Sequence, residues 1–562
     1  MSSSLKTLTK HPTISLVDSC TNLKLIKQIH TQLLVNGILG NSVYLSQFTS
    51  SIALNQTQSD DNLNYANEIL NQTEYPTIFT LNSMIRAYSR SPFPRRSFHY
   101  YNQILQSQIF SPDNYTFNFM VRSCTQICES PEIGFSIHSA IVKYGFELDP
   151  HVQSGLIHMY SEFGILGSCL SIYSTLFEPD LVSQTAMVSA CAKSGEVHIA
   201  REMFDKMPVR DSIAWTAMIS GYAQSGRSRE ALRLFRIMLS EDVKVNEGTL
   251  VSVLSACSHL GALDQGRWVH VYMEKNNVRM TVTLGTALVD MYSKCGNMCK
   301  AVEVFEKMRE KNVYTWSSFM NGLAINGFGI ECIEMFDLMK KEGVQPNDVT
   351  FVSVLRGCSV AGLVEEGIKH FDSMSNFYGL EPRQEHYGCV VDLYGRAGYL
   401  EDAINFIQGM PIKPHAAAWG ALLNACNIHG NLKLSELASR KLVELECKND
   451  GAYVNLSNIY AESSEWVKVS NVRKLMKNAG VKKIPGCSVI EVNGEDHEFL
   501  VGDETHPRYG EIKVMMGEIA RRLRLPGYVA NPNPVSFDME EEENYNFLVN
   551  GLDQPRNYKD FT

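Results

Sequence analysis

Residues 211–238 read DSIAWTAMISGYAQSGRSREALRLFRIM, and this stretch decides the fold. In its first half, apolar residues recur at helical spacing up to Gly226, and glycine is the residue that most often follows a helix end. In its second half, apolar residues stand at i, i+3, i+4 and i+7 between Ala231 and Met238, which marks one face of a second helix. The stretch therefore predicts two helices joined by a turn.

The glycine that follows the first helix recurs along much of the chain. Intervals of 31, 31, 35, 35, 31, 35, 36 and 32 residues separate Gly164, Gly195, Gly226, Gly261, Gly296, Gly327, Gly362, Gly398 and Gly430. The second-helix pattern recurs as well, in apolar sets that begin at Ala200, Ala301 and Cys332. Helices this short cannot bury their apolar faces in pairs, so successive pairs must stack. The sequence predicts an all-α fold, an α-solenoid of helix-turn-helix repeats.

The composition is that of a folded chain without a membrane segment. Of the 562 residues, 44% are hydrophobic and 20% are charged, and no run of eighteen apolar residues occurs. Trp215, Trp316 and Trp419 stand at the starts of first helices and are expected in the core. The cysteines lie mostly inside apolar patterns and indicate buried thiols of a reducing compartment, as at Cys124, Cys191, Cys257, Cys358 and Cys426. No metal site or cofactor is expected.

The stretch at 211–238 and a second one, NVYTWSSFMNGLAINGFG at 312–329, resemble the repeats of plant pentatricopeptide-repeat (PPR) proteins of the PLS class. In that class, units of about 31, 35 and 36 residues alternate. The resemblance implies a right-handed superhelix. A tetratricopeptide-repeat solenoid is the main alternative, but it keeps one period and carries a W-x-x-L-G signature, whereas this chain has varied periods and no such string.

The resemblance divides the chain into six parts. A transit peptide is assigned to 1–10, degenerate PPR repeats to 11–77, the PLS-type array to 78–415, two E motifs to 416–483, an E-plus segment to 484–530, and a truncated start of a DYW-like domain with an acidic tail to 531–562. The first seventeen residues contain no acid, which suits a transit peptide, although a frayed polar terminus has the same composition. The E-plus match rests on KKIPGCSVIEVNGEDHEFLVGDETHPRYGEI at 482–512.

The family resemblance implies that each repeat reads one RNA base with its fifth and last residues. The pairs are Asn82 with Asp113, Ser154 with Asp180, Thr185 with Asp211, Thr216 with Asn246, Thr286 with Asn312, and Ser317 with Asn347. The family's code assigns them U, G, G, A, A and A, from the 5′ end of the RNA. The alternative for each pair is an ordinary helix cap, because these residue types favour helix starts.

Two further sets of residues are candidates for RNA contact. Side chains at the second position of a repeat are expected to sandwich bases, or else to pack between repeats: Phe79, Val182, Ile213 and Tyr314. Basic residues at the ends of first helices, two positions before a glycine except at Arg90, are expected to meet phosphates, or else to be solvated helix ends: Arg90, Lys193, Lys294 and Arg396. The net charge of −10 disfavours tight non-specific binding and suits a protein whose affinity depends on base contacts.

The sequence does not indicate an enzyme. A DYW domain resembles zinc cytidine deaminases, which need His-x-Glu and Cys-x-x-Cys because the metal takes His and two thiolates while Glu moves the proton. This chain contains neither spacing. Only an extension of the chain into those motifs would restore a deaminase.

Three functions remain open from the sequence. The favoured one is site recognition for C-to-U editing of organelle transcripts, with single-stranded RNA as one partner and a deaminase bound in trans through residues 416–530. The alternative is an organelle RNA stabilisation or splicing factor without an editing role. A peptide-binding scaffold is the third. A mitochondrial location is expected, with the chloroplast as the alternative.

Overall fold

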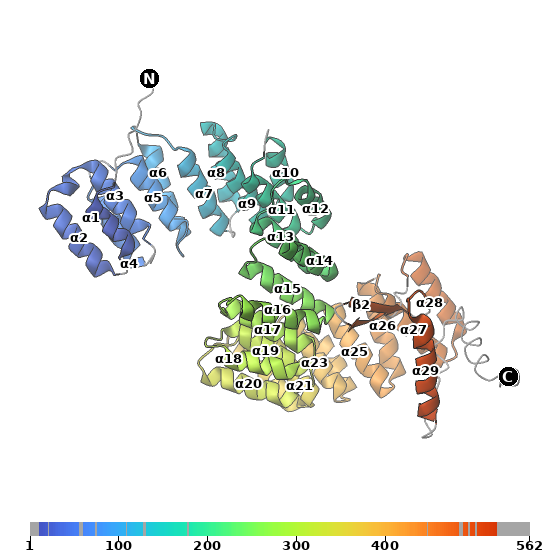
Figure 1. Ribbon diagram of the computed structural model, residues 1–562. Coiled ribbons are helices and arrows are strands. Elements are labelled where there is room, and N and C mark those ends of the chain that lie inside the picture. Colours follow the sequence, from blue (N-terminus) through green and yellow to red (C-terminus); the bar gives the residue numbers. More distant parts are fainter. Residues whose placement is uncertain are drawn as a thin grey trace. The chain divides into compact units, whose positions relative to one another are not determined.

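The computed structural model describes residues 10–20, 22–55, 60–73, 76–107, 109–127, 131–176, 179–446, 448–482, 487–492, 495–500 and 503–524. The chain divides into two compact bodies, Met1–Ala256 and Cys257–Thr562, which we call the N-terminal body and the C-terminal body. Residues 1–9 of the expected transit peptide and the expected DYW-like segment and tail at 531–562 lie outside the described residues. Figure 1 shows that both bodies consist of stacked helices.

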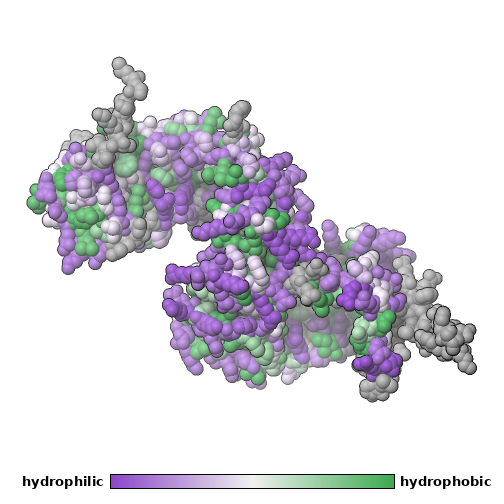
Figure 2. All heavy atoms as spheres, viewed as in Figure 1, coloured by the Kyte–Doolittle hydropathy of each residue, from purple (hydrophilic) through white to green (hydrophobic). Residues whose placement is uncertain are grey.

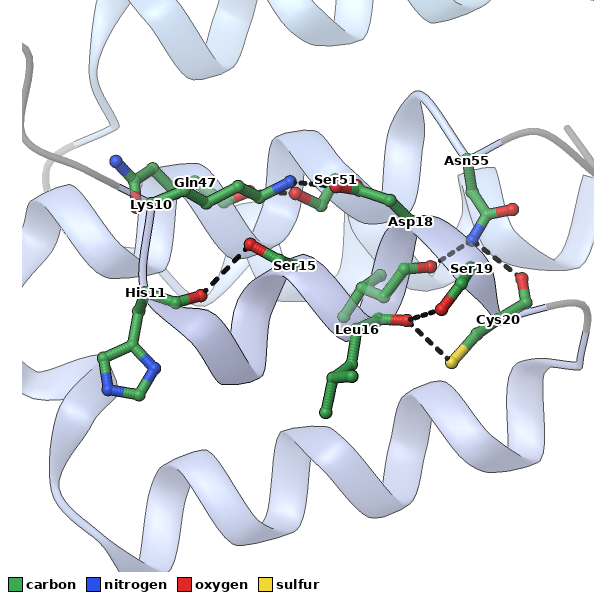
Figure 3. Close-up of polar contacts among 11 residues, drawn as sticks. Lys10, His11, Ser15, Leu16, Asp18, Ser19, Cys20, Gln47, Ser51 and Asn55 are labelled. Atoms are coloured by element: carbon green, nitrogen blue, oxygen red, sulfur yellow. Dashed lines mark hydrogen bonds and ion pairs between the residues drawn. The ribbon is translucent and has the colours of Figure 1, made fainter.

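The N-terminal body begins with a short helical cluster. Its elements are α1 (Pro12–Ser15), η1 (Leu16–Ser19), α2 (Leu23–Val35), η2 (Ile38–Gly40), α3 (Ser42–Ala53) and α4 (Asp60–Asn71). Figure 3 shows how its polar groups join: the buried Asn55 amide donates to the carbonyls of Val17 and Cys20, at 2.7 and 3.0 Å. Because Ile14 and Val17 are fully buried, the chain is already part of the core from residue 12 onward.

The rest of the N-terminal body is a series of helix pairs. The first helices are α5 (Ile78–Tyr88), α7 (Asn114–Gln126), α9 (Pro150–Glu162), α11 (Leu181–Lys193) and α13 (Ser212–Gln224). The second helices are α6 (Ser97–Gln106), preceded by η3 (Pro94–Arg96), and α8 (Pro131–Tyr144), α10 (Leu166–Ser174), α12 (Val197–Lys206) and α14 (Ser228–Ser240). The next first helix is α15 (Glu247–Leu260).

The C-terminal body continues the same alternation. Its first helices are α17 (Val282–Lys294), α19 (Val313–Ile325), α21 (Asp348–Ala361), α23 (Gln384–Arg396), α25 (Ala416–His429) and α27 (Asp450–Glu462). Its second helices are α16 (Leu263–Lys275), α18 (Met298–Lys307), α20 (Gly329–Lys341), α22 (Val364–Asn376), α24 (Leu400–Gln408), α26 (Leu432–Leu445) and α28 (Trp466–Asn478). The expected α-solenoid is confirmed, and first helices from α5 to α27 begin at the residues where the sequence units begin.

The first helices form the inner row of each body. Consecutive first helices pack directly on one another, as α9 does on α11 and α19 on α21. Each second helix packs on first helices, as α12 does on α11 and α13. Among the described residues of either body, no two neighbouring second helices contact each other to a similar extent. Because the first helices are the more closely spaced row, each body curves with that row on its concave side.

The recurring glycines close the first helices as the sequence predicts. All nine adopt a left-handed backbone, with φ from 67° at Gly261 to 90° at Gly327. At the end of α11, the N–H of Gly195 donates to the carbonyl of Ala192 at 3.2 Å, and the next N–H donates to the carbonyl of Cys191 at 3.0 Å. A residue with a Cβ would be strained in this conformation. The glycine therefore fixes the length of the first helix.

The expected core residues are buried. Trp215, Trp316 and Trp419 are 1%, 3% and 8% exposed. The five cysteines that the sequence places in the core are buried. Burial raises the pKa of Cys124 to about 12 and that of Cys426 to about 11, so both are thiols rather than thiolates at neutral pH. Figure 2 shows hydrophilic residues over most of the visible face, with apolar residues in scattered patches.

The E-plus region departs from the all-α expectation. Strands β1 (Cys487–Val492) and β2 (Glu495–Leu500) form an antiparallel hairpin in which Cys487 pairs with Leu500 and Val492 with Glu495. Helix α29 (Tyr509–Arg524) follows. The sequence Asn493–Gly494 between the strands is the strongest short signal for a hairpin, and the sequence interpretation did not use it.

Candidate nucleic-acid interface

At the six predicted pairs, the inner helix begins after an Asp or Asn that caps it, and this residue is the last of the preceding repeat. The side-chain oxygen accepts a bond of 2.8–3.0 Å from the backbone N–H three residues on. The capping residues are Asp113, Asp180, Asp211, Asn246, Asn312 and Asn347. Such a cap stabilises a helix by ~1 kcal/mol. The capping role is therefore present at all six sites, and a base can contact only the atoms that the cap leaves over.

Three of the six pairs are joined by a direct hydrogen bond. Asn82 Nδ2 donates to Asp113 Oδ1 at 2.9 Å, and Thr185 Oγ1 donates to Asp211 Oδ1 at 3.3 Å. Asn246 Nδ2 donates to Thr216 Oγ1, also at 2.9 Å. In these repeats the fifth residue and the last residue, about 26–31 positions apart in sequence, meet at the junction between two repeats.

The other three pairs meet through a hydroxyl that the sequence interpretation missed. Ser317 Oγ lies 2.8 Å from Thr350 Oγ1, and Thr350 Oγ1 donates to Asn347 Oδ1, also at 2.8 Å. Thr315 joins Thr286 to Asn312 in the same way, at 2.8 and 3.0 Å. Ser183 bonds to Ser154 at 2.8 Å and receives its backbone cap from Asp180.

Five of the six junctions have a Ser or Thr hydroxyl at this position. At the junction of Asp211, Ala214 occupies the position instead. Thr116, Ser183, Thr249, Thr315 and Thr350 are the third residues of their helices and are fully buried. Their signal in the sequence is a Ser or Thr three residues after the capping Asp or Asn, which is the spacing of a capping box. The hydroxyls of the four threonines also donate to the oxygen of the cap residue and hold it in one orientation.

The cap also decides which polar atom remains at the surface. Because the oxygen of the capping Asn must accept the backbone N–H, its amide nitrogen is left for other partners, and at Asn246 that partner is Thr216 Oγ1. Within the described chain, Oδ2 of Asp180 and Asp211 and Nδ2 of Asn312 and Asn347 have no hydrogen-bond partner in the protein. An Asp junction therefore presents an acceptor, and an Asn junction presents a donor.

The fifth residues lie behind these atoms. Asn82, Ser154, Thr185 and Ser317 are 6%, 8%, 6% and 2% exposed, whereas Thr216 and Thr286 are half-buried. The accessible polar atom of most pairs thus belongs to the last residue. The fifth residue supports it from the core side.

The second residues of inner helices are exposed apolar side chains. Phe79, Val182, Ile213 and Tyr314 are 56%, 57%, 59% and 64% exposed, so they do not serve mainly as packing between repeats. Tyr115 and Val349, which hold the same position in α7 and α21, are 62% and 50% exposed. The sequence interpretation missed these two because it considered only decodable repeats. Six inner helices thus carry an exposed apolar side chain at the same position of the repeat.

The four candidate phosphate-binding residues differ in their partners. Lys294 Nζ lies 2.9 Å from Asp290 Oδ2, and Arg396 Nε lies 2.9 Å from Asp392 Oδ2, one turn earlier on the same helix. Lys193 pairs with Glu162 of the preceding inner helix.

The fourth residue, Arg90, is exposed and has no ion pair within the part of the chain that the structure describes. Three of the four charges are thus neutralised.

The described residues offer neither a metal site nor a membrane-spanning helix. They contain no group of three or more His, Cys, Asp or Glu arranged to hold a metal ion. No helix among them is both long enough and apolar enough to cross a membrane.

Comparison with protein families matches two kinds of repeat description. The PPR repeat family matches residues 210–259 and 311–360, and the PPR repeat matches 185–212, 286–313, 349–377 and 385–413. The E motif matches residues 429–491.

Several curated proteins of Arabidopsis thaliana are similar over most of their length. One pentatricopeptide repeat-containing protein is 56% identical over 535 residues, covering 95% of this chain and 87% of its own. Another, named ELI1, chloroplastic, is 38% identical over 531 residues, covering 94% and 83%. Among solved structures, the pentatricopeptide repeat protein PPR10 from maize gives a TM-score of 0.45 at 15% identity, covering 84% of this chain and 74% of that chain.

Proposed function

The chain belongs to the pentatricopeptide-repeat protein family, and on that premise we propose that it binds one specific single-stranded RNA along its inner helices. The observation that carries the proposal is the set of six repeat junctions. The helix cap fixes the orientation of an Asp or Asn side chain at each junction, and at Asp180, Asp211, Asn312 and Asn347 it leaves one polar atom without a partner in the described chain. A fixed donor or acceptor is what discrimination between base edges requires.

The exposed apolar residues support the same function. Phe79, Tyr115 and Tyr314 stand beside the junctions and offer aromatic faces on which unpaired bases stack. Val182, Ile213 and Val349 offer apolar contact at the same position of other repeats. Each base would then lie between two such side chains, with its edge toward one junction.

The base preferences follow from the junction types. Asn82 with Asp113 would take U, the two Ser or Thr with Asp pairs G, and the three Ser or Thr with Asn pairs A. The repeats that begin at 247 and 348 have Val251 and Val352 at the fifth position and lie outside the code, and no base is assigned to the repeat that begins at 114. The proposed site thus reads U, any base, G, G, A, any base, A, A from the 5′ end.

The C-terminal region suggests which process the protein serves when it binds RNA. The E motif at 429–491 supports a role as site-recognition factor for C-to-U editing, in which residues 416–530 bind a deaminase supplied in trans. Helix α29 supports such docking, because Val514, Met515 and Met516 are 75%, 61% and 61% exposed. We place the protein in an organelle, the mitochondrion or, as for the relative named chloroplastic, the plastid.

The test of RNA binding compares two probes by fluorescence anisotropy with the full chain. One probe carries the proposed bases, and in the other the A and G positions are exchanged. We expect the first to bind at least tenfold tighter, since each well-placed hydrogen bond contributes ~1 kcal/mol and several positions change. Equal binding to both probes would contradict sequence-specific recognition.

The editing role needs a separate test in plants that lack the protein. We expect C-to-U conversion to be lost at one organelle site that lies downstream of a match to the proposed sequence. Loss of transcript abundance or splicing with all editing intact would replace the editing role by RNA stabilisation or splicing.

A further inference from the structure

Three arginines of the N-terminal body share one face of its inner row. Arg86 lies one turn after Asn82 on α5, and Arg90 lies in the turn that follows the last residue of this helix, Tyr88. Arg122 is the ninth residue of α7, as Arg86 is of α5, and these two helices pack on each other. The arginines therefore lie beside the junction of Asn82 and Asp113.

No acid neutralises this cluster. Within the described chain, none of the three guanidinium groups forms an ion pair. The Nε atom of Arg86 is shielded from water and has no hydrogen-bond partner, and its guanidinium carbon lies 5.7 Å from the centre of the Phe119 ring. An arginine that is partly desolvated without a partner is costly to hold in a fold.

The charges also act on one another. Burial and then the charge of Arg90 lower the pKa of Arg86. The pKa of Arg122 is lowered mostly by burial, next by the charge of Arg90 and then by the charge of Arg86. Both shifts have the direction expected of like charges held close together. An anion between them would relieve the repulsion.

The inner row carries one acid at positions that correspond to those of the arginines, and this acid is already paired. At the ninth and thirteenth positions of α5, α7, α9 and α11, Glu162 is the one acidic residue. It pairs with Lys193 and lies 3.7 Å from His158 Nδ1. The cluster is thus left open on the inner row beside the proposed base-reading atoms.

From this geometry we infer that Arg86, Arg90 and Arg122 bind the phosphodiester groups at the 5′ end of the RNA. The inference rests on the proposed function, since it names where that RNA's backbone is held. Guanidinium groups suit phosphate because their planar N–H donors match its oxygens. The arginines bind the RNA backbone irrespective of its sequence, and the junctions beside them contact the bases and supply the sequence preference.

The test measures how RNA binding depends on salt in the full-length chain. Neutralising three phosphate contacts with R86Q/R90Q/R122Q should reduce the slope of log K against log salt by about 2, at about 0.7 per phosphate of a single strand. The preference for the proposed probe over the exchanged one should stay unchanged. R86K/R90K/R122K should keep the slope, because it keeps the charges.

A matched control removes three other inner-row charges. In K193Q/K294Q/R396Q the net charge changes equally, but each lost cation already pairs with a carboxylate. The slope should then change by less than half as much. Because Arg86 is half-buried, R90Q/R122Q serves as a second variant whose two positions are exposed, with an expected reduction of about 1.4.

The outcomes separate the inference from the proposed function. Equal slope reductions in the cluster variants and the control would overturn the inference, while sequence-specific binding by the unaltered chain would still support the function. If the unaltered chain binds neither probe, both fail.

Discussion

The two bodies differ in the charge of their inner helices, although both are built from the same repeat. We compare the ninth and thirteenth residues counted from the start of each inner helix; for α5 the thirteenth, Arg90, lies just beyond the helix end. At these positions of α5, α7, α9 and α11, the N-terminal body carries four basic residues and one acid, Glu162. At the same positions of α17, α19, α21 and α23, the C-terminal body carries three basic residues and two acids, Asp290 and Asp392. This difference shows that the charge on the inner helices varies independently of the helical scaffold in this fold.

The largest expected effect tests whether the scaffold is the same in both bodies. Trp215 meets Phe204 edge-on with ring centres 4.9 Å apart, and Trp316 meets Phe305 at 5.0 Å. We expect W215A and W316A each to lower the free energy of unfolding by ~3–5 kcal/mol, because both leave a cavity in the core. Urea denaturation measures both. A loss confined to one variant would show that the two cores are not equivalent.

The next effect concerns binding rather than folding. We expect F79A in the N-terminal body and Y314A in the C-terminal body each to weaken RNA binding by ~1–3 kcal/mol, which is the cost of losing one stacked base. Stability should change by less than ~0.5 kcal/mol, since both side chains are exposed. W268A is the control, because Trp268 is 51% exposed but lies on α16, a second helix. Equal loss of affinity in the control would contradict an inner-row binding site.

A third prediction concerns a double variant that removes the charge difference between the inner helices of the two bodies. The double variant D290N/D392N removes the carboxylates that hold Lys294 and Arg396, so both cations become free for phosphate. We expect the salt dependence of RNA binding to steepen by about 1.4 in slope. The control D205N/D337N removes two acids that pair with Arg201 and Lys340 on second helices, and it should steepen the slope less. An equal effect would mean that the location of the charge does not matter.

The smallest effect is a shared pH dependence. His138 Nδ1 lies 2.7 Å from Tyr160 Oη, and His270 Nδ1 lies 2.9 Å from Tyr292 Oη. Burial, as the largest cause, lowers the pKa of both histidines below 6.5. The unfolded chain therefore binds protons more readily, so stability is complete above pH 6.5 and falls as the pH drops toward the folded pKa.

The matching measurement is thermal melting between pH 7 and about pH 5. We expect H138Q and H270Q each to reduce the acid sensitivity by a similar amount, because glutamine keeps a polar partner for the tyrosine but does not titrate. An acid sensitivity that neither variant changes would assign it to other groups.

Much of the fold could be predicted from the sequence because the repeat is encoded locally. A glycine such as Gly195 ends a helix through its own backbone conformation, and the apolar spacing after it defines the next helix. The capping residues could be predicted for the same reason, since the side chain of Asp211 bonds only three residues away. The β-hairpin was missed although its Asn493–Gly494 signal was present.

The rest of the candidate site depends on contacts between repeats. Thr116 bonds to Asn82, 34 residues away, and the sequence alone does not show that its hydroxyl faces the junction. The arginine cluster was missed because Arg86 and Arg122 become neighbours only when α5 and α7 stack. The low exposure of fifth residues such as Ser317 likewise follows from packing against the next repeat.

The central claim is that the cap residue of each junction selects one base, and the measurement that tests it most directly is RNA selection from a randomised pool with N246D and N312D. Aspartate keeps the cap and replaces the amide nitrogen by an oxygen, which at position 246 must accept a hydrogen bond from Thr216 Oγ1 where the amide donated one, so the fold should be preserved. We predict that each variant changes a single selected base from A to G, at positions two nucleotides apart, one for each body. Unchanged base preferences in both variants would contradict the account.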